Sequence, residues 1–91
     1  MNPHSGGSAV PVFNCIVHVA SAADGTIIAR VANLAGIEGR GRSEREALAQ
    51  AVAAFKAVVS RYHAAGEPIP WLESPARPLP GESERLIAVH L

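Results

Sequence analysis

A single amphipathic helix with a marked beginning and end constrains this sequence more than any other feature. Ser43 and Glu46 form a capping box, in which the Ser43 hydroxyl accepts from the Glu46 amide and the Glu46 carboxylate reaches back to the Ser43 amide. The pattern ends at Gly66, which gives a helix of about 21 residues, ~30 Å long. Between these residues, apolar side chains recur at spacings of three and four on one face: Leu48, Ala51, Val52, Phe55, Val58, Val59 and Tyr62. That face must lie on an apolar surface.

Alternating apolar and polar residues predict two strands before the helix. Residues 12–20 place β-branched and aromatic side chains on one face, and residues 26–33 alternate in the same way. The Asp24-Gly25 pair between them is a turn signal, because glycine supplies the positive φ that closes a hairpin. The two strands should therefore pair directly and antiparallel.

A short third strand and a late fourth strand complete the predicted sheet. Residues 35–42 contain glycines at alternate positions, which suit a twisted or bulged strand just before the helix. Five prolines hold residues 67–81 in an extended connection, and residues 85–91 alternate again as a final strand. The order β-β-β-α-β predicts an α+β fold, with an antiparallel three- to four-stranded sheet covered on one face by one long helix.

One covering helix leaves the opposite face of the sheet open. If Ile16 or Ile28 lies on that face, apolar surface is exposed to water, which monomeric proteins rarely retain. We therefore expect a homodimer, a higher homo-oligomer or a protein partner to cover it. The final strand is the expected contact between copies, through Leu86, Ile87, Val89 and Leu91.

Composition narrows the class of protein further. The 91 residues suffice for one domain, which we assign to residues 11–91 after a disordered tail at residues 1–10. Eight basic residues balance eight acidic ones, so the broad positive field of a nucleic-acid-binding protein is missing. A single cysteine excludes an intramolecular disulfide, and no segment has the apolar length of a signal peptide or a membrane span. A cytoplasmic location is expected.

Residue types that could support catalysis or metal binding each have a simpler structural explanation. Asp24 belongs to a turn, Glu46 to the capping box and Glu38 to a solvated strand, so these acids form no convergent phosphoryl-transfer site. Cys15 lies on an apolar strand face, where a thiol behaves as a small buried hydrophobe. The histidines lack the close spacing of zinc ligands: His4, His18, His63 and His90. The sequence therefore predicts no enzyme, no metal and no cofactor.

Several short motifs resemble the HicB-like antitoxin family. The match covers residues 13–71, in which Ala32, Asn33 and Ala35 stand where the family has two prolines and an acid, and Ile37 stands where it commonly has cysteine. The motifs that carry the resemblance are Asp24-Gly25, Ala32-Asn33-Leu34-Ala35-Gly36, Gly39-Arg40-Gly41-Arg42-Ser43, Glu46-Ala47 and Gly66-Glu67-Pro68-Ile69-Pro70.

The resemblance implies a partial ribonuclease-H-like fold without nuclease activity, which binds and blocks a small ribonuclease toxin called HicA. Family members that repress their own operon carry an additional DNA-binding element, for which the residues after the connection are too few, so no direct DNA binding is expected. Orphan copies without a toxin also occur. The leading hypothesis is a homodimeric antitoxin-like binding module; the alternative is an orphan self-associating domain without toxin or catalysis. A residual nuclease would rest on fold analogy alone.

Partner contacts are expected at the sheet edge and the connection, through Asn33, Leu34, Arg40, Arg42 and Trp71. Two interpretations of the basic residues before the helix stay open. Arg40, Arg42 and Arg45 could contact RNA or an acidic partner near the positive end of the helix dipole. Arginines on a short edge strand also discourage unwanted strand pairing, which is the simpler interpretation.

Overall fold

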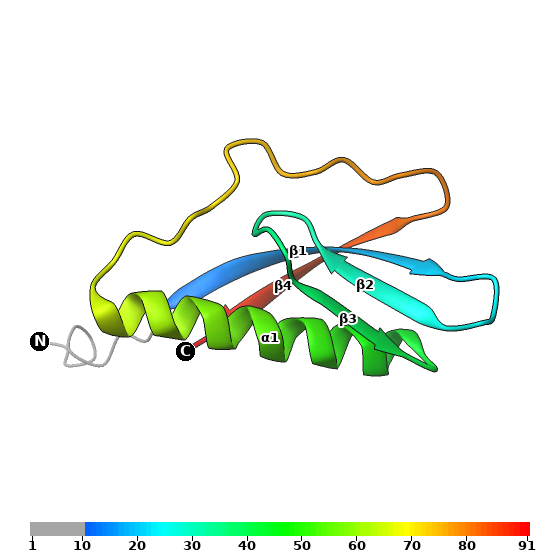
Figure 1. The fold of residues 1–91 in the computed structure, drawn as a ribbon, viewed down its shortest axis with the longest axis horizontal. Helices are drawn as coiled ribbons and strands as arrows, with labels where there is room; N and C mark the ends of the chain where they lie inside the picture. Colours follow the sequence, from blue (N-terminus) through cyan, green and yellow to red (C-terminus); the bar gives the residue numbers. More distant parts are fainter. Residues whose placement is uncertain (1–10) are drawn as a thin grey trace, which may run out of the picture.

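The sheet has four antiparallel strands, and one long helix lies against one of its faces (Figure 1). The computed structural model describes residues 11–91, and the predicted tail at residues 1–10 lies outside the described residues. The strand order across the sheet is β3-β2-β1-β4. The predicted α+β class and the order β-β-β-α-β are confirmed. In chain order the elements are β1 (Val12–Ser21), β2 (Ile27–Val31), β3 (Glu38–Gly41), α1 (Glu44–Ala65) and β4 (Ser83–His90).

The predicted hairpin joins β1 and β2. Ser21 pairs with Ile27 next to the turn, and the antiparallel register continues to the far end of β2. In the turn, Asp24 Oδ1 accepts from the Thr26 amide at 2.9 Å, which lowers the pKa of the Asp24 carboxyl. Asp24 therefore stabilises the turn to which the sequence assigned it.

β2 and β3 are shorter than predicted because the chain turns between them. β2 ends at Val31 rather than at residue 33, and β3 spans Glu38–Gly41 rather than residues 35–42. Gly36 has a φ of 79°, a conformation that favours glycine, and the Val31 amide donates to the Ile37 carbonyl across the turn. β4, in contrast, begins two residues earlier than predicted.

α1 begins and ends where the sequence predicts. Ser43 Oγ accepts from the Glu46 amide at 3.1 Å, and Gly66 has a left-handed φ of 69°. One detail of the capping box differs from the prediction, because Glu46 Oε1 accepts from the Arg42 amide at 2.9 Å instead of the Ser43 amide. Gly41 leaves room for this, since an added Cβ there would meet the Glu46 side chain.

The core lies between α1 and the sheet. Of the predicted helix face, only part is fully buried, and Leu48, Val52, Val58 and Tyr62 are half-buried at its margins. α1 contributes the buried Ala47, Ala51, Phe55 and Val59. The strands contribute Cys15, Val17, Val19, Ala29, Val31 and Val89.

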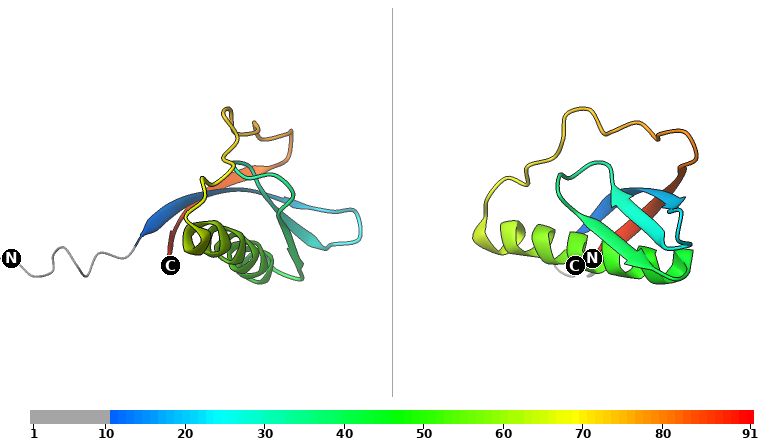
Figure 2. Two further views of the ribbon diagram at one scale, coloured as in Figure 1. Left: turned by 60° about the vertical axis from the view of Figure 1, so that its left-hand side comes forward. Right: turned by 45° about the vertical axis from the view of Figure 1, so that its right-hand side comes forward.

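The proline-rich connector, residues 67–82, crosses to the side of the sheet away from α1 (Figure 2). Its Leu72 amide donates to the Asn33 carbonyl at 3.1 Å, and its Ala76 amide donates to the Ala32 carbonyl at 3.0 Å. The prediction that this face is open is therefore right only in part. The connector covers one portion, because it is held to the loop after β2.

Candidate functional site

Asn33 has a structural role in the fold. Its Oδ1 accepts from the Ile16 amide at 3.1 Å, and its Nδ2 donates to the Asn14 carbonyl at 2.8 Å. Both backbone groups belong to the edge of β1 beyond the point where β2 ends. The side-chain amide therefore continues the hydrogen bonding of the sheet in place of a strand, and it is not a free group for a partner.

The other predicted partner residues are not brought together in one patch. Leu34 is 2% exposed and belongs to the core, so its side chain offers no surface to a partner. Arg42 directly precedes the start of α1, whereas Trp71 packs against Phe55 near the middle of that helix, ~16 Å further along its axis. The Trp71 ring lies 6.0 Å from the Phe13 ring and 5.9 Å from the Phe55 ring, between centroids, and anchors the connector.

One of the three arginines in the basic cluster before α1 is paired within its own chain. Arg40 Nε lies 2.9 Å from Glu38 Oε2 in an exposed ion pair. The amides of the helix N-terminus that would attract an anion include the Glu46 amide, which donates to Ser43. Arg42 and Arg45 remain exposed. The exposed positions of these side chains agree with the solvated-edge interpretation.

The two edges of the sheet differ in how their backbone groups are satisfied. On β3, the Arg40 amide points away from β2 and donates to Gln50 Oε1 of α1 at 3.1 Å. The next edge amide, that of Arg42, donates to Glu46. Side chains of α1 therefore seal the β3 edge against another strand.

The β4 edge has less cover: Arg85 Nη1 donates to the outward Glu84 carbonyl at 3.1 Å, and the other outward backbone groups of β4 have no hydrogen bond within residues 11–91. β1 and β4 share a register in which Leu91 N donates to Pro11 O, so odd-numbered residues of β4 face β1. The outward backbone groups are therefore those of Glu84, Leu86, Ala88 and His90. No other described segment pairs with them.

The predicted oligomer residues on β4 are split between the two faces of the sheet. Leu86 is 72% exposed, whereas Val89 is 4% exposed and belongs to the core. Ile87 and Leu91 are half-buried on the helix side. Val89 is therefore corrected to a core residue, since alternation directs its side chain toward α1.

An apolar patch lies on the sheet face away from α1. Ile16 of β1 pairs directly with Leu86 of β4, and Asn14 pairs with Ala88. Ile16 is half-buried, while Leu86 and Ala88 are exposed. We call these three residues, Ile16, Leu86 and Ala88, the open-face patch.

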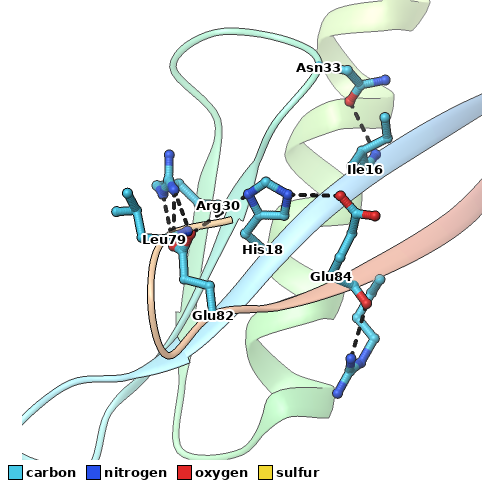
Figure 3. Close-up of polar contacts among 8 residues, drawn as sticks. Ile16, His18, Arg30, Asn33, Leu79, Glu82 and Glu84 are labelled. Carbon is cyan, nitrogen blue, oxygen red and sulfur yellow. Dashed lines mark hydrogen bonds and ion pairs between the residues drawn. The ribbon is translucent and has the colours of Figure 1, made fainter. Parts of the chain in front are cut away.

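A buried histidine lies beside this patch, and sequence reasoning missed it (Figure 3). The His18 side chain is 0% exposed, and its Nε2 lies 3.1 Å from Glu84 Oε2. Its Nδ1 has no hydrogen-bond partner, since the nearest Glu82 oxygen is 3.8 Å away. The sequence placed His18 on the face away from the core by alternation but gave no sign that residues 66 positions later would cover it.

Glu82 holds the end of the connector in place over His18. Its carboxylate accepts from the Leu79 amide at 2.7 Å and from Arg30 Nη2 at 2.9 Å. The Leu79 hydrogen bond and the Arg30 guanidinium lower the pKa of the Glu82 carboxyl. The group is therefore a charged anchor between the connector and β2, and its contacts are structural.

The remaining candidate sites offer little chemistry. A cavity of ≈ 360 Å³ lies between the connector and the turn after β2, but its guanidinium, that of Arg30, is already bound by Glu82. Cys15 is fully buried as predicted, and burial raises its pKa to about 11, so its thiol is unreactive at neutral pH.

Across residues 11–91, no three His, Cys, Asp or Glu side chains are grouped to hold a metal ion. Over the same range, no helix combines the length and apolar character needed to span a bilayer.

Comparison with known proteins gives no relative from which the role of the open-face patch or the β4 edge could be inferred. No protein-family model, no curated protein and no solved structure matches this chain significantly. The resemblance to HicB-like antitoxins therefore stays a prediction from the short motifs, and the site is defined by the open-face patch and the β4 edge.

Proposed function

We propose that this protein is a protein-binding module of the HicB-like antitoxin type, which neutralises a small ribonuclease toxin by direct binding. The observation that carries the proposal is the open-face patch. Leu86 is 72% exposed at its centre and lies beside Ile16 on a hydrogen-bonded sheet. Exposed apolar groups on such a surface favour a protein partner. The toxin identity of that partner comes from the motif resemblance.

The proposal assigns no catalysis and no cofactor to the chain. The acids that a phosphoryl-transfer site would need are engaged elsewhere: Asp24 accepts from the Thr26 amide, Glu38 pairs with Arg40, and Glu46 accepts from the Arg42 amide. These contacts support a binding role over a residual nuclease. The proposed location is cytoplasmic, where a ribonuclease toxin would act.

The test is to capture the tagged protein from lysate of its native cells and to measure the eluate by native mass spectrometry. A stoichiometric small basic companion is expected. Leu86→Lys should lose the companion, because it places a charge at the centre of the open-face patch. Leu79→Lys is the matched control, since Leu79 is also exposed, at 60%, but lies on the connector. Capture without a companion contradicts the proposal.

A second candidate is an orphan self-associating domain with no toxin. The free edge of β4 favours it, because unpaired strand edges readily accept another strand. The same eluate separates the two candidates. A homo-oligomer alone supports the orphan role.

A further inference from the structure

We propose that two copies of this chain pair through their β4 edges, antiparallel and about a twofold axis, with Ile87 of one copy opposite Ile87 of the other. This inference goes beyond the proposed function, since it concerns the free chain and stands whether or not a toxin binds. The occupant of the edge is a second copy, and the register follows from the backbone and from the polar side chains of β4.

Backbone geometry limits the possible registers. The outward backbone groups of β4 belong to even-numbered residues, so these must form the hydrogen-bonded pairs with the second copy. A twofold axis can then pass through a hydrogen-bonded pair, such as Leu86 with Leu86, or through a pair without hydrogen bonds, such as Ile87 with Ile87. The second choice uses residues 83–91 in full.

The polar side chains of β4 select the Ile87-centred register. It places Glu84 opposite His90 at both ends of the new ladder, and Leu86 opposite Ala88 near its centre. The Leu86-centred register instead places Glu84 opposite Ala88 and leaves His90 beyond the strand. An imidazole N–H can donate to a facing carboxylate, whereas a methyl group offers that carboxylate no hydrogen bond.

Side chains on both faces of the sheet would make favourable contacts in this pairing. On the helix side, the half-buried Ile87 side chains of the two copies would meet at the axis. On the opposite side, the two open-face patches would join, because Leu86 of each copy lies beside Ala88 of the other. α1 packs mainly against β3 and β2, so it does not cover the β4 edge.

The charges on β4 do not oppose the pairing as edge charges commonly do. Arg85 Nε lies 2.8 Å from Glu44 Oε2 of α1, and Glu84 contacts His18. Arg85 is therefore directed to its own chain, whereas Glu84 contacts His18 through Oε2 and keeps Oε1 for His90 of the second copy. β4 also contains no proline and no glycine that would disrupt a ladder.

The first experiment tests the register by disulfide formation in the purified full chain. In Ile87→Cys, two thiols at the axis are oxidised to one disulfide, and the two electrons and two protons pass to diamide. Facing residues without hydrogen bonds have Cα atoms ~4.5 Å apart, within disulfide range. Leu86→Cys is the matched control, because its cysteine faces Ala88. The buried Cys15 stays silent in both variants.

Covalent dimer is expected from Ile87→Cys and little from Leu86→Cys on a non-reducing gel. Equal or greater cross-linking of Leu86→Cys would overturn the proposed register. Absence of cross-linking in both variants would overturn the β4 pairing itself, provided that both variants give wild-type circular dichroism.

The second experiment changes no core residue and tests the proposed pairing of Glu84 with His90. The wild-type mass in solution is expected to be twice the 9.5 kDa chain mass at high micromolar concentration. His90→Glu should raise the dimer dissociation constant about tenfold, because it faces Glu84 twice, whereas His90→Lys should leave it nearly unchanged. A monomeric wild type, or equal dissociation constants for the two variants, would overturn the proposal. Either result leaves the toxin capture experiment to be judged separately.

Discussion

Asn33 takes the place of a strand residue at the edge of β1. β2 ends at Val31, and the Ile16 amide and the Asn14 carbonyl then have no β2 backbone opposite them. A primary amide carries one acceptor and two donor hydrogens, so a single side chain satisfies both groups. The position therefore requires an amide of this length for the stability of the sheet.

Replacing Asn33 should measure this role directly. Asn33→Ala should lower the free energy of unfolding by about 1–2 kcal/mol, because two backbone groups of β1 lose their partners. Urea denaturation followed by circular dichroism gives the value. Asn14→Ala is the control, since it removes an exposed amide but keeps the Asn14 carbonyl, and it should change stability by less than ~0.5 kcal/mol. Wild-type stability of Asn33→Ala would refute the structural role.

Glu82 should make the protein acid-sensitive. Its pKa is lower in the folded chain than the ordinary glutamate value of 4.5, so the unfolded state binds more protons in this range. The carboxylate therefore stabilises the fold fully above pH 4.5, and this contribution is lost as the pH falls through the folded pKa. Glu82→Gln should cost about 1–2 kcal/mol at neutral pH and flatten the loss of stability below pH 4.5.

Urea denaturation of both proteins at neutral pH and at several acidic pH values checks this prediction. Glu73→Gln is the control, because Glu73 is an exposed carboxylate in the same connector. It should leave the free energy of unfolding at neutral pH within ~0.5 kcal/mol of the wild type. Parallel pH curves for Glu82→Gln and the wild type would exclude Glu82 as an acid-sensitive anchor.

Individual side chains show where sequence reasoning stops. The turn role of Asp24 and the burial of Cys15 were predictable, because turn signals and strand alternation are local. The roles of Asn33 and His18 were not, because they depend on which strand lies next to β1 and on the path of the connector. His18 meets Glu84 across 66 positions of the chain, a contact that no local pattern encodes.

Among the elements, β3 and α1 approach each other closely enough for their backbones to touch at Gly39. A Cβ at Gly39 would overlap the backbone of Ala47 and Ala51, so glycine is required for α1 to lie at this distance. The sequence suggested a bulge as the reason for glycine in this strand. The structure gives close approach of the helix backbone as the reason.

Gly39→Ala should therefore push α1 away from β3 and lower the free energy of unfolding by at least ~2 kcal/mol, as overpacked positions do. Gly41→Ala is the matched control in the same strand. Its Cβ would meet only the Glu46 side chain, which can move, so its cost should be smaller. Thermal or urea unfolding of the two variants shows which of them loses more stability. Equal stability of the variants would contradict the close packing at Gly39.

Elements with local signals were predicted best. The ends of α1 were correct because Ser43 and Gly66 set them through their own caps. The ends of β2, β3 and β4 differed by a few residues, because strand length is set by pairing partners elsewhere in the chain. The connector was recognised as extended from its prolines, but its position over the sheet depends on hydrogen bonds from Leu72 and Ala76 to the loop after β2.

At the scale of the whole molecule, the core is small for an independent domain. Phe55 is the one Phe, Tyr or Trp side chain that is fully buried among residues 11–91, and much of α1 meets the sheet through alanine. Domains of this size bury a modest fraction of their surface and have a small stability margin. Association between copies would add to that margin.

If β4 pairs with a second copy, the melting temperature should rise with protein concentration, because association favours the folded state by mass action. His90→Glu should show a weaker concentration dependence than His90→Lys, since it weakens the proposed pairing. Differential scanning calorimetry over a wide range of concentrations provides the comparison. A melting temperature independent of concentration in the wild type would speak against a stable pair.

The sealed β3 edge has a consequence for what this protein can build. A sheet with two open edges can add copies at both sides without limit, as amyloid-like fibres do. Here Gln50 Oε1 accepts from the Arg40 amide at the β3 edge. Within residues 11–91, the β4 edge is therefore the one left for another chain. Growth by strand addition stops once that edge is used. Gln50 and Glu46 of the helix thus separate a terminating unit from a repeating one.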